Sequence, residues 1–188
     1  MTTIGVVSDT HSFPLPAQIF KDFEKVDFII HAGDFCEVQD FKTFAKFKDL
    51  RAVLGNMDSA ALRKQLPERL IITCEEIRIG VVHGSGAPQG ILERIRSEFK
   101  NDQVDAIVFG HSHQPLIERA GRILFFNPGS PNDTVRAPYC SYGILKVTGK
   151  NIEAQIIRVK SWINYGLHGG PNTSSKSVKQ KHASFAGF

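Results

Sequence analysis

Short apolar segments alternate with amphipathic segments along the first two thirds of the chain. The apolar runs predict interior strands at 4–7, 28–30, 52–54, 79–82, 106–109 and 124–126. Apolar residues at helical spacing predict three helices, which contain Ile19, Phe20 and Phe23, then Phe41, Phe44 and Ala45, then Ile91, Leu92, Ile95 and Phe99. Pro88 is expected in the first turn of the third helix. Strands that alternate with helices indicate an α/β protein.

The second half of the chain has the pattern of antiparallel hairpins. Paired strands are predicted at 69–74 with 77–82, at 116–118 with 122–126, and at 141–147 with 152–159. In the last strand, apolar residues at 152, 154 and 156 alternate with Glu153 and Gln155, so one of its faces should be buried. The two patterns together predict a mixed sheet, or two sheets packed against each other.

A short polar segment follows each of the six predicted interior strands. In chain order the segments hold Asp9 and His11, His31 and Asp34, Asn56 and Asp58, His83, His111 and His113, and Asn-Pro-Gly-Ser at 127–130. Because the carboxyl ends of strands form the ligand crevice of open α/β sheets, we expect these side chains to line one site.

The residue types in these segments suit a metal site. Imidazole and carboxylate together are typical ligands of Zn, Mn, Fe, Co or Ni. The i, i+2 spacing of Asp9/His11 and of His111/His113 puts both members of each pair on one side of an extended backbone. Asp34 is the only carboxylate in its segment, and its two oxygens can bridge two ions about 3.5–4 Å apart.

Each motif taken alone also has a plainer interpretation. Asp-x-His is typical of a capped turn, Gly-Asn-x-Asp of an ordinary turn and His-x-His of an exposed strand. His31 is expected to be a hydrogen-bonded core residue, or to support a ligand, rather than to be a ligand itself. The metal-site hypothesis therefore depends on joint occurrence. Apart from His31, four of the seven histidines fall in these segments, beside Asp9, Asp34 and Asn56.

Composition and charge fit one domain with an appended tail. Of the 188 residues, 41% are hydrophobic and 22% charged, as in an ordinary globular protein. Residues 1–165 are predicted to form the domain, and residues 166–188 a flexible basic tail that lacks periodicity. Three of the four net positive charges lie in that tail, so bulk nucleic-acid binding by the domain is not expected.

The cellular location is predicted from the same composition. No apolar run approaches the ~18 residues of a membrane span, and the first residues lack the basic region of a signal peptide. Cys36, Cys74 and Cys140 form no CxxC pair and are expected to be reduced thiols, mostly buried. These features predict a cytoplasmic protein with no membrane partner.

The ordered series D-x-H, G-D, G-N-x-D, H-G and G-H-x-H resembles the motif set of the calcineurin-like metallophosphoesterases. It is most similar to their small single-domain bacterial and archaeal phosphodiesterase branch, from Thr3 to about Val159. The resemblance implies a four-layer α/β sandwich, in which two mixed β-sheets face each other and are flanked by helices. It also implies an enzyme that acts on a small phosphate ester, a phosphodiesterase rather than a phosphomonoesterase.

The resemblance assigns seven metal ligands. Asp9, His11, Asp34 and His113 would hold the first ion, and Asp34, Asn56, His83 and His111 the second, with Asp34 bridging. Manganese is the first expectation for both ions, with nickel, iron, cobalt and zinc as alternatives. A hydroxide between the ions would attack phosphorus in line. Asp9, Asp34, Asn56 and His83 are accordingly the predicted catalytic residues.

Further residues receive supporting roles from the resemblance. Asn56 would also hold the phosphoryl oxygens, and residues 127–130 match the loop that shapes one wall of the site. Asp58 or backbone carbonyls are expected to orient the imidazoles. Arg136 is a candidate for binding a substrate phosphate, although an inert, solvated arginine is an equal interpretation.

Two positions depart from the family pattern. Many members have histidine in the third motif, where it can protonate the leaving group, and this chain has Met57 there. The small branch often has a second histidine after His83-Gly84, and this chain has Ser85. Neither position is an assigned ligand, so the departures bear on leaving-group catalysis and on substrate choice.

Other classes of function stay open. Some relatives, such as the phosphoesterase-like subunit of the retromer coat, look like protein-binding scaffolds on the same fold. A scaffold has no need of a complete ligand set, and all seven ligand positions are competent here, which favours the enzyme. A metal-dependent hydrolase of a non-phosphate ester is the third hypothesis. A homo-oligomer is compatible with each of them.

Overall fold

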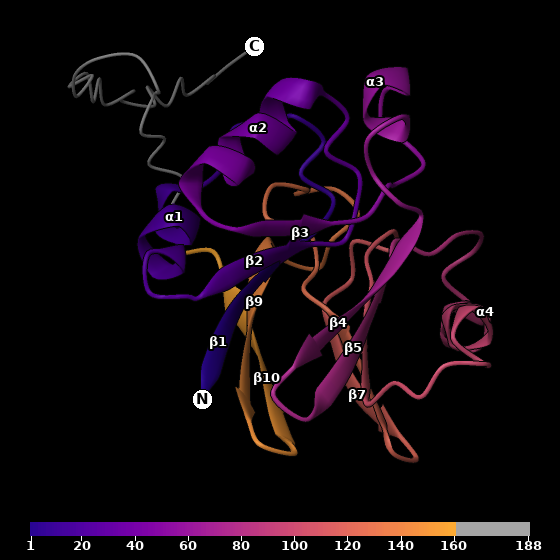
Figure 1. The fold of residues 1–188 in the computed structure, drawn as a ribbon. Helices are drawn as coiled ribbons and strands as arrows, with labels where there is room; N and C mark the ends of the chain where they lie inside the picture. The colour runs from indigo at the N-terminus through magenta and orange to yellow at the C-terminus, as the bar shows by residue number, and fades with distance from the viewer. Residues whose placement is uncertain (161–188) are drawn as a thin grey trace, which may run out of the picture.

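Residues 1–160 of the computed structural model are described, and within them the strands form two five-stranded sheets (Figure 1). The first has the order β10-β9-β1-β2-β3, with β1 Thr2–Val7, β2 Phe28–His31, β3 Leu50–Ala52, β9 Ser141–Thr148 and β10 Asn151–Arg158. The second has the order β4-β5-β6-β8-β7, with β4 Arg69–Cys74, β5 Ile77–Val82, β6 Ala106–Val108, β7 Leu116–Ala120 and β8 Ile123–Asn127. The predicted tail at 166–188 lies outside the described residues.

Each sheet contains three parallel neighbours. Strands β1, β2 and β3 run parallel in the first sheet, and β5, β6 and β8 run parallel in the second. The three predicted hairpins are present as the antiparallel pairs β4/β5, β7/β8 and β9/β10. Both sheets are therefore mixed, and the loops that leave the carboxyl ends of the parallel strands gather at one edge of the sandwich (Figure 1).

The alternation of side chains along the strands builds three apolar layers. In β1 and β2, Ile4, Val6, Phe28 and Ile30 point between the sheets, where they meet residues of the second sheet such as Val108. Alternate residues of the same strands face outward and are covered in turn. Because both faces are buried, these strands read as continuous apolar runs.

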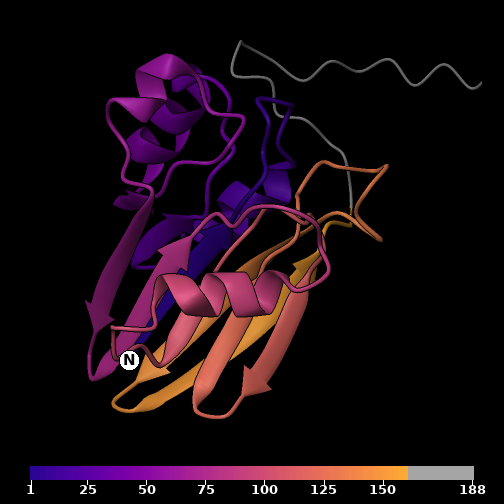
Figure 2. The ribbon, with the colours of Figure 1, turned by 90° about the vertical axis from the view of Figure 1, so that its right-hand side faces the viewer.

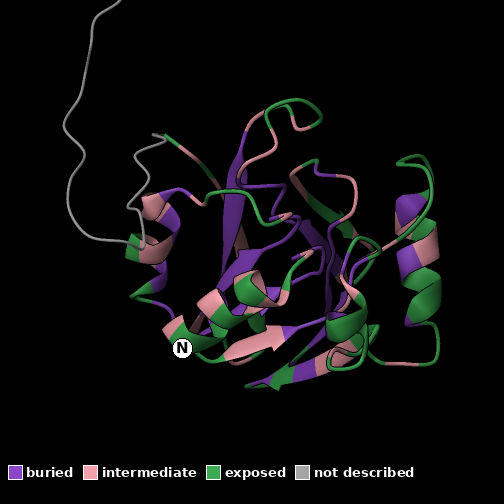
Figure 3. Cartoon of the chain, turned by 90° about the horizontal axis from the view of Figure 1, so that it is seen from above, coloured by how far each residue is buried: buried purple, intermediate pink, exposed green. Residues whose placement is uncertain are grey.

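Helices cover the outer face of each sheet, which completes the four-layer sandwich. Helices α1 (Ala17–Phe23) and α2 (Val38–Phe47) bury Phe23 and Phe44 against the first sheet. Helix α4 (Ile91–Glu98) buries Ile95 against the second sheet, across whose outer face it lies in Figure 2. Seen from above in Figure 3, buried strands occupy the centre, and exposed residues lie on the helices and loops around it.

Two local predictions are wrong, and one short helix was not predicted. Strand β3 ends at Ala52, so segment 53–54 is buried or half-buried irregular chain that continues toward Asn56. Pro88 precedes helix α4, because Gly90 adopts a left-handed conformation at φ 69° and the helix begins only at Ile91. The four-residue helix α3 (Ala60–Arg63) was not predicted, since four residues are too few to show helical periodicity.

The cysteines agree with the prediction from the sequence. Cys36, Cys74 and Cys140 are free thiols, two of them buried. Among residues 1–160, no helix has both the length and the apolar character needed to cross a membrane.

Candidate metal centre

Five of the seven predicted ligands follow parallel strands and surround one open cavity of about 760 Å³. These are His11, Asp34, Asn56, His111 and His113, and Asp9 and His83 lie buried beneath them. Backbone hydrogen bonds tie the loops together: the Asp9 amide donates to the Gly33 carbonyl at 3.0 Å, and the His11 amide to the Asp34 carbonyl at 3.0 Å. The strand ends thus bring together residues separated by up to about a hundred positions in the chain.

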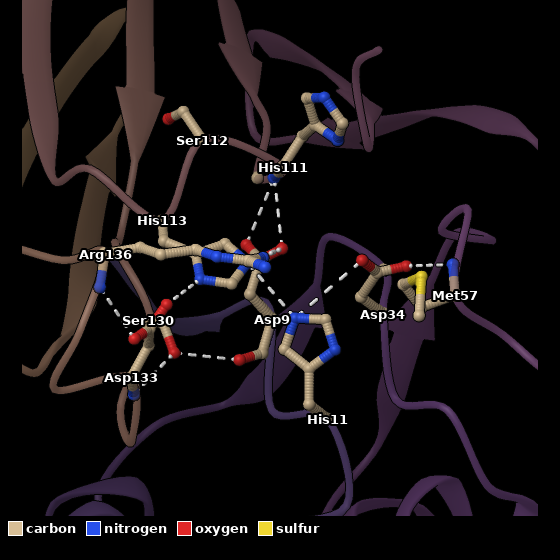
Figure 4. A network of polar contacts seen from close by, with 12 residues as sticks. Asp9, His11, Asp34, Met57, His111, Ser112, His113, Ser130, Asp133 and Arg136 are labelled. Atoms are coloured by element: carbon tan, nitrogen blue, oxygen red, sulfur yellow. Dashed lines mark hydrogen bonds and ion pairs between the residues drawn. The ribbon is translucent and has the colours of Figure 1, made fainter. Parts of the chain in front are cut away.

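Asp9, His11 and His113 form the first group of donor atoms. Their ligand atoms lie within 4.8 Å of one another. His113 Nε2 lies 3.1 Å from His11 Nε2 and 3.3 Å from Asp9 Oδ1 (Figure 4). Two imidazole nitrogens and a carboxylate oxygen at these distances are a donor set for a divalent transition metal.

A second group lies beside the first. His83 Nε2 is 3.2 Å from Asp34 Oδ2 and 3.1 Å from Asn56 Oδ1. His111 Nδ1 lies 3.0 Å from the same Asn56 oxygen. These four residues are the ones assigned above to the second ion.

Asp34 faces both groups with one oxygen. Its Oδ2 lies 3.2 Å from His83 Nε2 and 3.9 Å from His11 Nε2. Its other oxygen, Oδ1, accepts the Met57 amide at 2.7 Å, which fixes the carboxylate plane. Gly55 packs directly behind it, because a Cβ at that position would collide with Asp34 Oδ1 and the Asp34 amide nitrogen. The backbone of Gly55 and Met57 therefore holds the Asp34 carboxylate in the position that a bridging ligand requires.

The hydrogen bonds on the far side of the imidazoles determine which ring nitrogens face the cavity as acceptors. His83 Nδ1 lies 2.7 Å from the Ala32 carbonyl, and His111 Nε2 lies 2.8 Å from the Gly86 carbonyl. Because a carbonyl oxygen only accepts, these nitrogens donate, and in the neutral rings the opposite nitrogens carry lone pairs. Both lone pairs then face Asn56 Oδ1, itself an acceptor. Electron pairs that converge in this way fit a cation, so the residues present suit the metal that the donor set predicts.

The electrostatics agree with a cation site. Burial alone would lower the pKa of His83, but the carboxylates of Asp34 and Asp9 outweigh burial and raise that pKa to about 9. Burial lowers the pKa of His11 despite the same two carboxylates. The site thus has a negative potential strong enough to hold a proton on His83. A metal ion competes with that proton, so its binding should strengthen as pH rises.

The backbone of the ligand loops differs from the expectation. Asp9, His11, Asp34, His111 and His113 all have positive φ, between 50° and 66°. The i, i+2 pairs therefore converge through left-handed turns and not through extended chain. Non-glycine residues with positive φ cost of order 1–3 kcal/mol each and persist only where the surroundings impose them. Five such residues at one site indicate that the loops are shaped for ligand geometry.

One carboxylate at the site was not identified from the sequence. Asp133 Oδ2 accepts a short hydrogen bond from His113 Nδ1, and Asp133 Oδ1 accepts the Arg136 amide at 2.9 Å (Figure 4). Asp133 Oδ1 also accepts the Val135 amide at 2.8 Å. Burial would raise the pKa of Asp133, but the Arg136 amide and His113 lower it overall. The only sequence signal is a polar loop beyond residues 127–130, which resembles any turn.

Asp58 has a different role from the one expected. Its Oδ1 accepts the Cys36 amide at 2.8 Å and its Oδ2 accepts the Gly55 amide at 2.7 Å. It therefore braces two loops and orients no imidazole, whereas backbone carbonyls do so for two histidines, as the alternative predicted. His31 is fully buried, stacks on Phe35 and hydrogen-bonds Thr10 Oγ1 at 3.2 Å, which confirms its prediction as a core residue.

The loop after β8 forms one wall of the cavity. Ser130 Oγ donates to the Asp9 carbonyl at 2.9 Å, and the Asn127 side chain donates to the Gly110 carbonyl at 2.8 Å. Arg136 follows on the same loop and lines the cavity together with Met57. The structure thus brings to the site both Arg136, the candidate for phosphate binding, and Met57, which replaces the histidine of the family pattern.

Comparisons with known proteins show the family and the fold of the chain. The model of the calcineurin-like phosphoesterase superfamily domain matches residues 2–150. A probable metallophosphoesterase of Methanocaldococcus jannaschii is 40% identical over 165 residues, which cover 84% of this chain and 81% of that protein. A phosphodiesterase of the same organism is 30% identical over 143 residues, which cover 67% of this chain and 82% of that protein.

The solved structures include vacuolar protein sorting 29 from Cryptosporidium parvum. It superposes with a TM-score of 0.71 at 20% identity, over 85% of this chain and 92% of that one, which shows a shared fold. A Thermotoga maritima protein superposes with a TM-score of 0.67 at 27% identity, over 85% of this chain and all of that one. With the family model matched over most of the chain, the protein belongs to the calcineurin-like phosphoesterase superfamily.

Proposed function

We propose that the chain is a dinuclear metal-dependent phosphodiesterase. The observation that carries the proposal is the pair of donor groups that share Asp34 Oδ2. One contains His11, the other His83, at 3.9 and 3.2 Å from that oxygen. Two ions held side by side clamp the attacking and leaving oxygens of a phosphoryl group, which is the chemistry of phosphoester hydrolysis.

The proposed ligand sets are those that the sequence predicted. Asp9, His11, Asp34 and His113 would hold one ion, and Asp34, Asn56, His83 and His111 the other. When bound, the ions would activate a water molecule as nucleophile and neutralise the phosphoryl oxygens. Manganese is the proposed metal, and the cytoplasmic location stays a prediction.

The chain's own residues orient the reaction. The amides of Met57 and His111 donate to the carboxylates of Asp34 and Asp9, so neither carboxylate has to reorganise during turnover. The amide nitrogen of Asn56 is the proposed donor to a phosphoryl oxygen. Arg136, at the wall of the same cavity, would pair with the remaining phosphate charge.

Three arguments favour diesters over monoesters. Met57 lines the cavity where many relatives have histidine, and a thioether has no proton to give to a leaving alkoxide. A diester carries one negative charge fewer than a monoester dianion, which eases the approach of an anionic nucleophile. The similarity to a protein named phosphodiesterase supports the same choice.

The alternative is a protein-binding scaffold on the same fold. The fold it shares with vacuolar protein sorting 29 is compatible with that role, but a scaffold needs no convergent donor set. The test is a turnover screen. Metal-free protein is reloaded separately with Mn²⁺, Ni²⁺, Co²⁺, Fe²⁺ and Zn²⁺ and assayed on bis(p-nitrophenyl) phosphate, p-nitrophenyl phosphate and a cyclic nucleotide.

The proposal predicts turnover with at least one metal and a higher kcat/KM for the diester than for the monoester. Asp34→Asn serves as the matched inactive protein, which separates the protein's activity from a contaminant's. Absence of turnover with every metal, or equal turnover by the variant, would favour the scaffold.

A further inference from the structure

Exposed apolar side chains gather around the metal centre. Phe13, Met57 and Val135 are 63%, 58% and 89% exposed, and all three line the cavity that holds the ligands. The described residues contain only two other large hydrophobic side chains with such exposure, Met1 and Ile117, and neither lines this cavity. Single exposed apolar residues are normal, but a group at a cavity mouth is typical of a ligand-binding surface.

The three residues come from different loops and are held there by backbone bonds. Phe13 lies after β1, where its amide donates to the Thr10 carbonyl at 3.1 Å. Met57 lies after β3, and its amide donates to the bridging Asp34 carboxylate. Val135 lies after β8 and is fixed by Asp133. Because each backbone is tied to the ligand framework, the three apolar residues are positioned beside the metal centre.

We propose that Phe13, Met57 and Val135 form an apolar rim that binds an aromatic substituent of the phosphate ester. The inference rests on the proposed function and names its substrate class: aryl or nucleoside phosphodiesters, as opposed to small alkyl esters. The residues proposed to hold the metals and the phosphate, among them Asp34 and His113, line the same cavity as the three apolar side chains, and Arg136 offers a counter-charge at its wall. The cavity volume of about 760 Å³ is in the range of sites that enclose a small organic molecule.

The chemistry of the rim suits a flat ring. Phe13 offers an aromatic face for stacking, and such pairs contribute beyond the burial of their area. The Met57 thioether makes favourable contacts with ring edges. A methyl or ethyl substituent offers neither interaction and leaves the three side chains in water.

A binding experiment tests the rim without requiring turnover. Phenylphosphonate and methylphosphonate share a phosphorus–carbon bond that hydrolysis does not cleave, and differ only in the ring. Titration calorimetry on manganese-loaded protein should give an affinity for phenylphosphonate about tenfold higher than for methylphosphonate. Phe13→Ser and Val135→Ser should each weaken phenylphosphonate binding by roughly two- to tenfold and leave methylphosphonate binding unchanged.

Kinetics give an independent measure of the same preference. Phenyl p-nitrophenyl phosphate and methyl p-nitrophenyl phosphate release the same p-nitrophenolate, so leaving-group chemistry is matched. The methyl ester has its one ring on the leaving group, whereas the phenyl ester also retains a ring after cleavage. Phe13→Ser should therefore raise KM more for the phenyl ester than for the methyl ester and leave kcat within twofold. Ile117→Ser is the control, because Ile117 is exposed on β7 but does not line the cavity.

The outcomes separate the rim from the proposed function. Equal affinities for the two phosphonates, or equal losses on both in Phe13→Ser, would overturn the rim. The rim would also be overturned if the wild type is a dimer, Phe13→Ser is a monomer and both bind the phosphonates equally well. The three side chains would then form an interface between two copies of the chain. A retained phenylphosphonate preference without turnover of either ester would support the rim and refute the proposed function.

Discussion

Asp133 provides a quantitative test of how the protein positions a metal ligand. In Asp133→Asn, the side-chain oxygen can still accept the amides of Val135 and Arg136, which now hold Asp133 Oδ1 at 2.8 and 2.9 Å. The amide nitrogen then replaces Oδ2, the acceptor that faces His113 Nδ1. The substitution thus preserves the loop and removes one charge-assisted hydrogen bond from His113.

Two estimates of the cost agree. Removing a hydrogen bond to a charged group costs about 1.5–3 kcal/mol. Loss of a partner that orients a metal-ligating histidine weakens metal affinity or activity by about 10–100-fold, or about 1.4–2.7 kcal/mol. We therefore expect Asp133→Asn to weaken Mn²⁺ binding by about 10–100-fold, with the loss arising at the ion that His113 holds.

The assay is chelator competition for Mn²⁺, paired with thermal unfolding of the metal-free protein. Asp102→Asn is the matched control, because it also removes a carboxylate, one that pairs with Arg69 at 2.8 Å away from the cavity. If Asp133→Asn binds Mn²⁺ within twofold of wild type at an unchanged unfolding temperature, Asp133 does not position His113. A matching loss in Asp102→Asn would refute the reasoning equally.

Three further predictions concern the ligands, the leaving group and the half-buried carboxyl of Asp40. Asp34→Asn should lower kcat/KM more than substitution of His11 or His113, because Asp34 faces both donor groups; equal losses with two metals still bound to Asp34→Asn would contradict bridging. Met57→His should raise hydrolysis of alkyl monoesters by up to about 10²-fold and flatten the dependence on leaving-group pKa, since histidine supplies the missing acid; efficient alkyl monoester hydrolysis by wild type would show that another acid acts. Burial raises the pKa of Asp40 to about 6, so the folded state binds the Asp40 proton more tightly than the unfolded chain does. The protein should therefore lose up to about 3 kcal/mol of folding stability as pH rises from about 4 to about 6. In urea unfolding, Asp40→Asn should remove that loss, and an unchanged pH profile would count against the burial argument.

The apolar pattern predicted the interior strands and their shared site for one physical reason, whereas the four layers and the ligand sets came from the resemblance to the family. Strands buried on both faces produce uninterrupted apolar runs, and their carboxyl ends must lie at one edge of the sheet. Residues such as Asp9, Asp34 and His83 could therefore be placed together before any distance was known. The apolar strand that precedes each residue was enough to place it at that edge of the sheet.

What the sequence missed depends on contacts between distant segments. Asp133 reaches His113 across twenty positions, and nothing in its own loop marks that partner. The left-handed turns at Asp9 and His111 are imposed by neighbouring loops, whereas spacing alone suggested extended chain. Asp58 was adjacent to a ligand loop, but its carboxylate is satisfied by backbone amides. Hydrogen-bond partners of this kind follow from tertiary packing.

The central claim is that one carboxylate, Asp34, holds two metal ions within bridging distance. Electron paramagnetic resonance of the manganese-loaded protein, combined with elemental analysis, measures this directly. We predict two ions per chain and the signal of an exchange-coupled pair, as expected for ions about 3.5–4 Å apart. The six-line spectrum of an isolated ion, at one ion per chain and independent of added Mn²⁺, would contradict the account.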